Sequence, residues 1–250
     1  ASVCALFDDA SGMNWIPYAG AGVFCAGLLY VLLAALFRAF GASRVMRFFP
    51  PIVTGPVIIC IGLTLANSAV NNCASNWWIA LLAIAIVVVC NIWGKGMLKI
   101  IPILMGVVGS YLVAALCGQV DFSAVRDAAW IGFPVRGEDT VFALFNGCDG
   151  GRLVSSIAIM MPIALATMVE HIGDMCAISS TVGVNYVADP GLHRTLLGDG
   201  LATSMAAAFG APANTTYGEN TGVLALTKVY DPRVIRIAAV LAILFAFCPK

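Results

Sequence analysis

Two carboxylates lie in stretches of the sequence where a charged side chain is costly. Glu170 follows the uncharged run Leu153–Val169, and Glu219 lies in a polar segment between two apolar stretches. An acidic side chain inside a membrane costs roughly 2.5–3.5 kcal/mol on insertion scales, so one that is retained usually has a function. Carboxylates accept hydrogen bonds from N–H groups. We therefore expect these two residues to line a site for a neutral cyclic imide or amide.

The sequence around Glu219 also predicts a broken helix. Pro212–Gly218 has no helical pattern and is expected to be extended, and a short helix should follow from Asn220 to about Leu226. A break of this kind exposes backbone N–H groups at membrane depth, which is tolerated where they are buried in protein or line a cavity. These N–H groups would donate to carbonyl oxygens of a ligand, while the carboxylates accept from its N–H groups.

A purely structural reading is open for several polar residues of this region. Glu170 lies near the predicted end of its span and could simply reach the cytoplasmic interface. His171 is more often a packed or hydrogen-bonded side chain than a proton carrier, and Asn220 could be a helix N-cap. Asp199, between Gly198 and Gly200, is interpreted as structural, holding a loop or a helix start.

Other kinds of chemistry find little support. The nine cysteines contain no C-x-x-C pair and there are only two histidines, so no metal site is predicted. Serine pairs lack a base partner, and glycine-rich stretches are not followed by Lys-Ser/Thr, which argues against an enzyme and against a phosphate-binding loop. We expect no cofactor. The 13 basic and 13 acidic residues balance, which gives no indication of nucleic-acid binding.

The composition is that of an integral membrane protein. Of the 250 residues, 61% are hydrophobic and 10% are charged, with a mean hydropathy of +0.96. Soluble domains have about 45–50% apolar and about 25% charged residues. We therefore predict an all-α membrane protein with about eight segments, of which Pro162 should kink the fifth. They are Tyr18–Phe37, Pro51–Val70, Trp77–Trp93, Ile100–Val120, Leu153–Val169, Leu196–Ala211, the broken segment Tyr217–Leu226, and a run from Ile237 that looks truncated.

Basic residues indicate the orientation of these segments. If the first segment runs from outside to inside, nine basic residues are cytoplasmic and three are on the opposite face. The nine are Arg38, Arg44, Arg47, Lys95, Lys99, Arg194, Lys228, Arg233 and Arg236. This bias holds only if the broken segment counts as one crossing. The truncated last run indicates a piece of a longer protein.

The run Glu219–Lys228 matches a family signature. It resembles the motif of the nucleobase–ascorbate transporters (nucleobase:cation symporter 2): Gln, Glu or Pro, then Asn, any residue, Gly, four residues, Thr, and Arg, Lys or Gly. Asp189–Arg194 and Asn214–Asn220 are similar to the bacterial uracil permease branch, as are Phe48–Pro51 and Ile101–Leu104. The resemblance extends over nearly the whole chain from about Tyr18.

The resemblance implies a fold of fourteen transmembrane segments in two inverted repeats, with a core and a gate domain. Residues 1–43 would be the fourth, core segment, and residues 44–120 the fifth to seventh, gate segments. Residues 121–152 would be an extracytoplasmic loop, and residues 153–250 the eighth to truncated eleventh segments of the core. The protein would be a multi-pass symporter of the cytoplasmic (inner) membrane, in contact with the lipid bilayer and possible as a homodimer.

The resemblance also implies roles for individual residues. Glu170 and Glu219 would hydrogen-bond the pyrimidine ring of uracil, the backbone at Gly218 and Glu219 would contact it, and Tyr217 would line the site. Thr216, Asn220 and Gly222 would support the site structurally. Proton coupling is expected to involve Glu170, His171 and Asp174. The branch has a histidine at the position of Asp174, so either Asp174 takes over the role of that histidine or coupling runs through Glu170 alone. The residues implied to form the site are Glu170, His171, Asp174, Thr216, Tyr217, Gly218, Glu219, Asn220 and Gly222.

Three alternatives stay open beside a proton-coupled uracil permease. A purine or xanthine permease of the same fold is the nearest, although Glu at position 219 favours uracil. A sulfate-type anion transporter would need a cationic residue at the half-helix. A fragment that does not transport at all is the third, because the resemblance places a strand that covers the substrate outside this chain.

Overall fold

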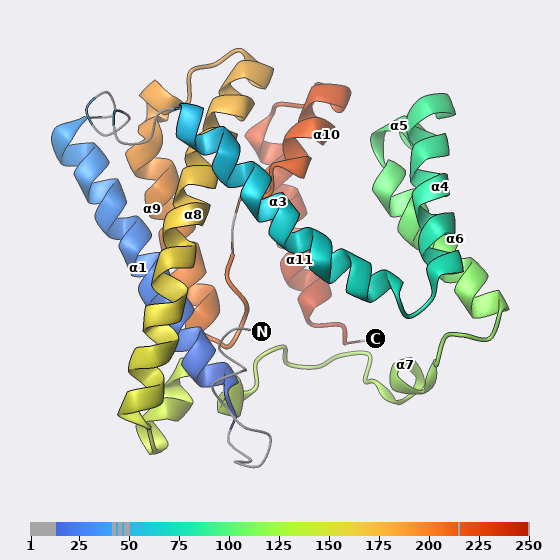
Figure 1. Ribbon diagram of the computed structural model, residues 1–250, viewed down its shortest axis with the longest axis horizontal. Helices are drawn as coiled ribbons and strands as arrows, with labels where there is room; N and C mark the ends of the chain where they lie inside the picture. The colour runs from blue at the N-terminus through green and yellow to red at the C-terminus, as the bar shows by residue number, and fades with distance from the viewer. Residues whose placement is uncertain (1–13, 42–43, 45–46, 48–50, 215, 250) are drawn as a thin grey trace. The chain divides into compact units, whose positions relative to one another are not determined.

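The structure, a computed structural model, describes residues 14–41, 44, 47, 51–214 and 216–249 (Figure 1). Two compact units are distinguished by their internal contacts, one of residues 1–58 and 133–221 and the other of residues 59–132 and 222–250. Every regular element among the described residues is helical. The helices are α1 (Ile16–Phe40), α3 (Pro51–Cys73), α4 (Trp77–Trp93), α5 (Met97–Ile100), α6 (Pro102–Leu116), α7 (Ser123–Asp127), α8 (Gly150–Val182), α9 (Leu192–Ala208), α10 (Glu219–Thr227) and α11 (Pro232–Ala246), with short turns at η3 (Gly137–Asp139), η4 (Val141–Asn146) and η5 (Val187–Gly191).

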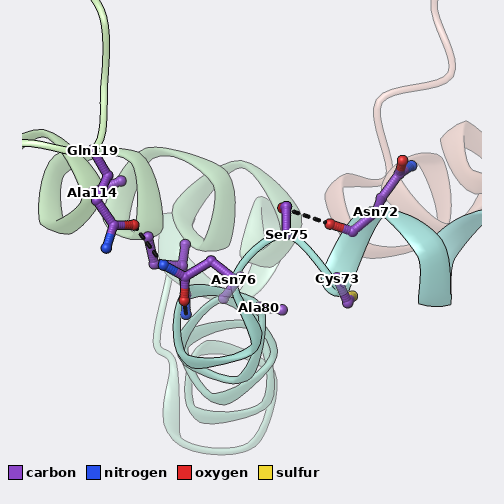
Figure 2. Close-up of a pocket in the computed structure, with 9 residues that line it drawn as sticks. Asn72, Cys73, Ser75, Asn76, Ala80, Ala114 and Gln119 are labelled. Carbon is purple, nitrogen blue, oxygen red and sulfur yellow. Dashed lines mark hydrogen bonds between the residues drawn. The ribbon is translucent and has the colours of Figure 1, made fainter.

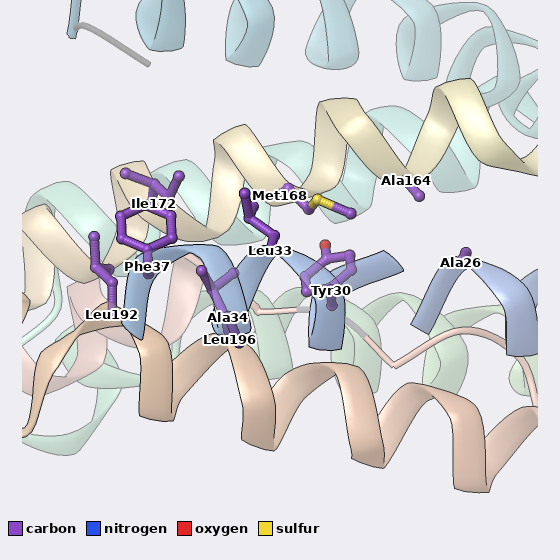
Figure 3. Packing of buried hydrophobic residues seen from close by; sticks show 10 residues of the cluster. All are labelled: Ala26, Tyr30, Leu33, Ala34, Phe37, Ala164, Met168, Ile172, Leu192 and Leu196. Atoms are coloured by element: carbon purple, nitrogen blue, oxygen red, sulfur yellow. The ribbon is translucent and has the colours of Figure 1, made fainter. Parts of the chain in front are cut away.

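The first unit is built on a bundle of α1, α8 and α9. These three helices lie side by side in Figure 1, and α1 makes its main contacts with α8 and α9. Figure 3 shows the buried side chains where they meet. The cluster consists of Ala26, Tyr30, Leu33, Ala34, Phe37, Ala164, Met168, Ile172, Leu192 and Leu196. Because this core is apolar, any polar group within it must find a partner inside the bundle.

Glycines allow α1 and α9 to cross closely. A Cβ built on Gly200 of α9 would lie 2.6 Å from the Cβ of Tyr30 and 2.7 Å from the carbonyl oxygen of Gly27. The hydroxyl of Ser204 donates to the carbonyl oxygen of Phe24 at 3.1 Å across the same crossing. Small residues let helix backbones approach in this way in membranes. The many small residues of α9 are consistent with this close packing.

Helices α1 and α8 run parallel to each other. At one end, the Asp149 backbone N–H, just before α8, donates to the hydroxyl of Tyr18 near the start of α1 at 3.0 Å. At the other end, Phe37 of α1 and Ile172 of α8 share the buried cluster. Two parallel helices of one chain must be separated by an odd number of crossings of the bilayer. The three apolar segments predicted between them meet this requirement.

Helix α8 is longer than its predicted segment. It has 33 residues and continues through Pro162 to Val182, where Gly183 ends it in a left-handed conformation. The expectation that Glu170 lies near the end of the span is therefore wrong. The uncharged run stops at Val169 because the residues that follow are polar, but His171 and Ile172 are buried in the bundle, so the helix itself does not end there. Membrane helices tolerate an internal proline when the freed carbonyl group is satisfied locally.

The second unit contains an antiparallel pair, α4 and α6. Gly106 of α6 packs against Val87 of α4, and Gly109 packs against Ile86. The Asn76 side chain accepts from the backbone N–H groups of Trp78 and Ile79 and so caps α4. In the loop after α6, the N–H and hydroxyl of Ser123 donate to the Asp121 carboxylate and lower its pKa below the usual range.

Length and apolarity single out two of the described helices as able to cross a bilayer. These are α1 and α8, while α4 and α6 are shorter apolar helices. The observed bounds of α4 are those predicted, Trp77–Trp93. Helix α6 is shorter than the predicted Ile100–Val120 segment, because Pro102 begins it at the first helical position.

Candidate functional site

The candidate site lies beside the middle of α1. The rings of Tyr30 and His171 are 6.4 Å apart and meet edge to face. Tyr30 is 14 residues after the first residue of α1 and 10 before the last, which corresponds to about 21 Å and about 15 Å along the helix axis. Glu170 immediately precedes His171 on α8. If α1 spans the bilayer, Glu170 therefore lies near the middle of the bilayer and not at the interface with water.

A buried histidine joins three parts of the first unit. Nδ1 of His171 lies 3.0 Å from Oδ2 of Asp199 on α9 and 2.7 Å from the hydroxyl oxygen of Thr216. The hydroxyl of Thr216 also donates to Oδ2 of Asp199, at 3.4 Å. Side-chain exposure is only 5% for His171 and 10% for Asp199. Both ring nitrogens have partners, because Nε2 lies 3.1 Å from the hydroxyl oxygen of Thr195.

Asp199 has a different role from the one inferred from the sequence. It was interpreted as holding a loop or a helix start, but it lies in the interior of α9, which runs from Leu192 to Ala208. Its carboxylate faces His171 and Thr216 in the bundle. A third acidic residue within a run of small residues was the signal that could have identified it. The flanking glycines suggested a loop, whereas one of them, Gly200, allows the close helix crossing.

The segment between α9 and α10 is non-helical, as predicted, and is fastened to the bundle. The hydroxyl of Thr203 donates to the backbone carbonyl of Asn214 at 2.6 Å. Two residues later, Thr216 reaches the pair formed by His171 and Asp199. Thr203 is itself buried. These hydrogen bonds fix the path of the chain just before the half-helix.

The residues of the predicted half-helix are placed as follows. Helix α10 begins at Glu219, so Asn220 is its second residue and not its N-cap. A Cβ on Gly218 would lie 2.9 Å from Oδ1 of Asp174, so the Asp174 carboxylate packs against the start of α10. Tyr217 is 61% exposed. The side chain of Glu219 lies outside the described part of the chain.

The predicted site residues thus fall into two groups. His171 and Thr216 are joined by a hydrogen bond, and Asp174 and Gly218 pack against each other. Asn220 is exposed, and a Cβ on Gly222 would meet no atom within 4 Å. The hydroxyl of Thr221 is an additional polar group at the start of α10. It is buried and has no hydrogen-bond partner among the described residues. Sequence reasoning missed Tyr30, Thr195, Asp199 and Thr203.

Each of the two units contains a cavity. In the first unit, a cavity of about 420 Å³ is lined mainly by apolar residues of α1 together with Met160 and residues 210–213. In the second unit, Figure 2 shows a more polar groove of about 740 Å³ at the turn between α3 and α4. There the amide of Asn76 donates to the Gln119 side-chain oxygen at 2.5 Å. The groove contains none of the predicted site residues.

Comparison with known proteins identifies the family. A model described as the Permease family matches residues 2–250. The chain is 40% identical over 242 residues to a uracil permease of Bacillus subtilis (strain 168), covering 92% of this chain and 54% of that protein.

Two further relatives carry the same name. A uracil permease of Bacillus caldolyticus is 41% identical over 238 residues, covering 92% of this chain and 54% of that protein. A uracil permease of Escherichia coli (strain K12) is 32% identical over 240 residues, covering 92% and 53%. The chain thus spans about half the length of the curated relatives it matches. All three are named as transporters and not as enzymes, which confirms the resemblance seen in the sequence. The chain belongs to the Permease family and is part of a helical integral membrane protein.

Proposed function

We propose that the protein containing this chain is a symporter that imports uracil across the cytoplasmic membrane. The observation that carries the proposal is the group of polar residues around His171 and Asp174, beside the middle of α1 and next to the start of the half-helix α10. Relatives named uracil permease match 92% of the chain. A polar site at this depth, in a chain of this family, fits transport of a small neutral solute.

Uracil offers two N–H donors and two carbonyl acceptors on one plane. In our proposal Glu170 and Glu219 accept from the ring N–H groups, and the backbone N–H groups at Gly218 and Glu219 donate to a carbonyl oxygen. Tyr217 lines the site. Asn220 and Gly222 shape the first turn of α10, and Thr216 fixes the segment before it. Glu170 immediately precedes His171, whose ring contacts Tyr30 of α1, and this placement in the bundle supports the first of these roles.

We propose that the coupling ion is a proton. Glu170, His171 and Asp174 lie within five residues on one helix and Asp199 faces them from α9, so that the region holds several groups able to bind a proton. In our proposal these groups carry the proton whose gradient drives import.

For the whole protein we propose fourteen segments in two inverted repeats, with a core and a gate domain. Residues 1–43 and 153–250 belong to the core and residues 44–120 to the gate, joined by an extracytoplasmic loop of residues 121–152. The parallel packing of α1 and α8 supports three crossings between them. The full-length protein would lie in the inner membrane, and a homodimer is the assembly that we propose to test.

Calorimetry on the purified full-length gene product tests the substrate. Uracil should bind, and xanthine should neither bind nor compete with it. Tighter binding of xanthine would instead support a purine permease of the same fold. The 250-residue chain titrated in parallel tests whether it binds uracil alone: binding by the full protein but not by the chain would mean that this piece does not transport by itself. Light scattering of the same sample gives the oligomeric state.

A further inference from the structure

The hydroxyl of Thr195 has two possible acceptors. Its oxygen lies 3.2 Å from the carbonyl oxygen of Leu192 and 3.1 Å from Nε2 of His171. A hydroxyl group carries one proton, so Thr195 can donate to only one of them at a time, while its oxygen can accept a hydrogen bond in either case. The choice depends on whether Nε2 of His171 carries a proton.

His171 can therefore exist in two protonation states with all of its hydrogen bonds made. In the neutral state, Nδ1–H donates toward Asp199 and Thr216, and Nε2 accepts from the Thr195 hydroxyl. In the protonated state, Nε2–H donates to the Thr195 oxygen, and the Thr195 hydroxyl turns to the Leu192 carbonyl. Only hydrogen atoms change place. Because an unpaired buried polar group is costly, a site that is satisfied in both states can take up and release a proton.

We propose that Thr195, His171 and Asp199 form a hydrogen-bonded group that holds the coupling proton, with the proton on Nε2 of His171. The proposal rests on the proposed function and adds two residues, Thr195 and Asp199, to it. The proton enters from water on the outer side, binds Nε2, and leaves from the same nitrogen toward the cytoplasm. Asp199 is a positioning residue, since it holds the Nδ1 side of the ring.

Thr216 connects these three residues to the segment that precedes α10, where the substrate is proposed to bind. Its hydroxyl lies between Nδ1 of His171 and Oδ2 of Asp199, and it is two residues from Gly218, next to α10. A change in charge on His171 therefore acts directly on the chain that presents Gly218. Among the described side chains, the titratable groups around the pair are Tyr30 from α1 and Glu170 and Asp174 from α8. The proton on His171 and the substrate beside α10 are in this way coupled.

Two transport measurements on the full-length protein separate proton coupling from substrate binding. Accumulation of labelled uracil driven by a pH gradient needs a proton to cross, whereas exchange of labelled for unlabelled uracil at equal pH does not. Thr195→Val keeps the side-chain shape but removes the hydroxyl, so it should lower accumulation about tenfold and retain exchange. Thr195→Ser, which restores the hydroxyl, should restore accumulation. Asp199→Asn should lower accumulation by more than exchange.

Thr181→Val is the matched control. Thr181 donates to the carbonyl of Ala177 in the last turn of the same α8 helix that carries His171, and its substitution should leave both measurements unchanged. Accumulation by Thr195→Val equal to that of the wild type would overturn the proposal. So would an equal loss of accumulation and exchange that Thr195→Ser does not repair, which is the result of a merely structural role. If Thr195→Val does not reach the membrane, Asp199→Asn tests the proposal instead: equal losses of accumulation and exchange in that variant would overturn it. Absence of uracil transport by the wild type would instead contradict the proposed function.

Discussion

At the scale of single residues, a nucleobase site in a membrane must replace the hydrogen bonds that the base makes in water. Acceptors for its N–H groups come from carboxylates, and donors for its carbonyl groups come from free backbone N–H groups at a half-helix. Charged acceptors make stronger hydrogen bonds than neutral ones. The affinity for uracil should therefore depend strongly on the charge at Glu219, and much less on its side-chain length.

Glu219→Gln tests this dependence. The amide keeps one acceptor but loses the charge, so the apparent affinity for uracil should fall about 10- to 150-fold, which corresponds to about 1.5–3 kcal/mol for a hydrogen bond to a charged group. Calorimetry on the purified full-length protein measures the change. Glu138→Gln, in the exposed turn η3, is the same substitution outside the site and should bind uracil like the wild type. Equal affinity in both variants would remove Glu219 from the site.

The polar residues of the site differ in how far the sequence alone could predict them. Glu170 and Glu219 were predicted because charge is rare in the apolar segments around them. The pairing of Asp199 with His171 could not be predicted, because it depends on how α9 is rotated against α8. A single sequence gives the order of the helices and their apolar faces, but not which polar side chains meet across the bundle.

At the scale of the elements, the site depends on the close crossing of α1 and α9. The glycines at positions 27 and 200 bring the two backbones together and thereby place Tyr30 beside His171. A side chain at this crossing must push the helices apart. The same helix carries Gly198, whose Cβ would meet no atom within 4 Å. Comparing substitutions at Gly198 and Gly200 therefore separates the effect of close packing from the effect of helix propensity.

Gly200→Ala and Gly198→Ala should have opposite effects on stability. The methyl group at position 200 would lie 2.6 Å from the Cβ of Tyr30 and 2.7 Å from the carbonyl oxygen of Gly27, so we expect destabilisation by about 1–3 kcal/mol, as for an overpacked core. At position 198 the substitution removes the conformational cost of glycine in a helix and should be neutral or stabilising by up to about 1 kcal/mol. Thermal unfolding of the purified proteins in detergent measures both. Equal unfolding temperatures for the two variants would contradict the crossing.

The elements were predicted well where apolar runs end at a turn and poorly where they end at polar residues. The bounds of α4 were predicted because Asn76 caps it and Gly94 ends it. For α8, the polar residues from Glu170 onward resembled a helix end, although the helix continues to Val182. Polar residues that face the inside of a bundle interrupt the hydropathy pattern without interrupting the helix.

At the scale of the whole molecule, the direction of the helices determines which loops face which side. Parallel α1 and α8 place Asp149 and the start of α1 on the same side of the membrane. The excess of basic residues after α1 and after α4 predicts that the ends of these two helices face the cytoplasm. We therefore propose that the loop before α8 is extracytoplasmic. This conclusion joins a packing observation to a charge pattern that is independent of it.

Cysteine labelling in whole cells tests this orientation. In a full-length background without other cysteines, the exposed Cys148 before α8 should react with a membrane-impermeant maleimide from outside. Ser75→Cys, between α3 and α4, should react in the same way, and Lys95→Cys, after α4, should react only in permeabilised cells. Labelling of Lys95→Cys from outside, or protection of Cys148 in intact cells, would reverse the proposed orientation.

The central claim is that the protein containing this chain imports uracil by means of its intramembrane carboxylates. Its most direct test is uptake of labelled uracil by bacteria that lack their own uracil permeases and express the full-length gene product. The account predicts concentrative uptake that unlabelled uracil suppresses, that a protonophore abolishes, and that is lost in Glu170→Gln although the variant is present in the membrane. Uptake that persists in Glu170→Gln, or that follows a sodium gradient and survives the protonophore, would contradict it.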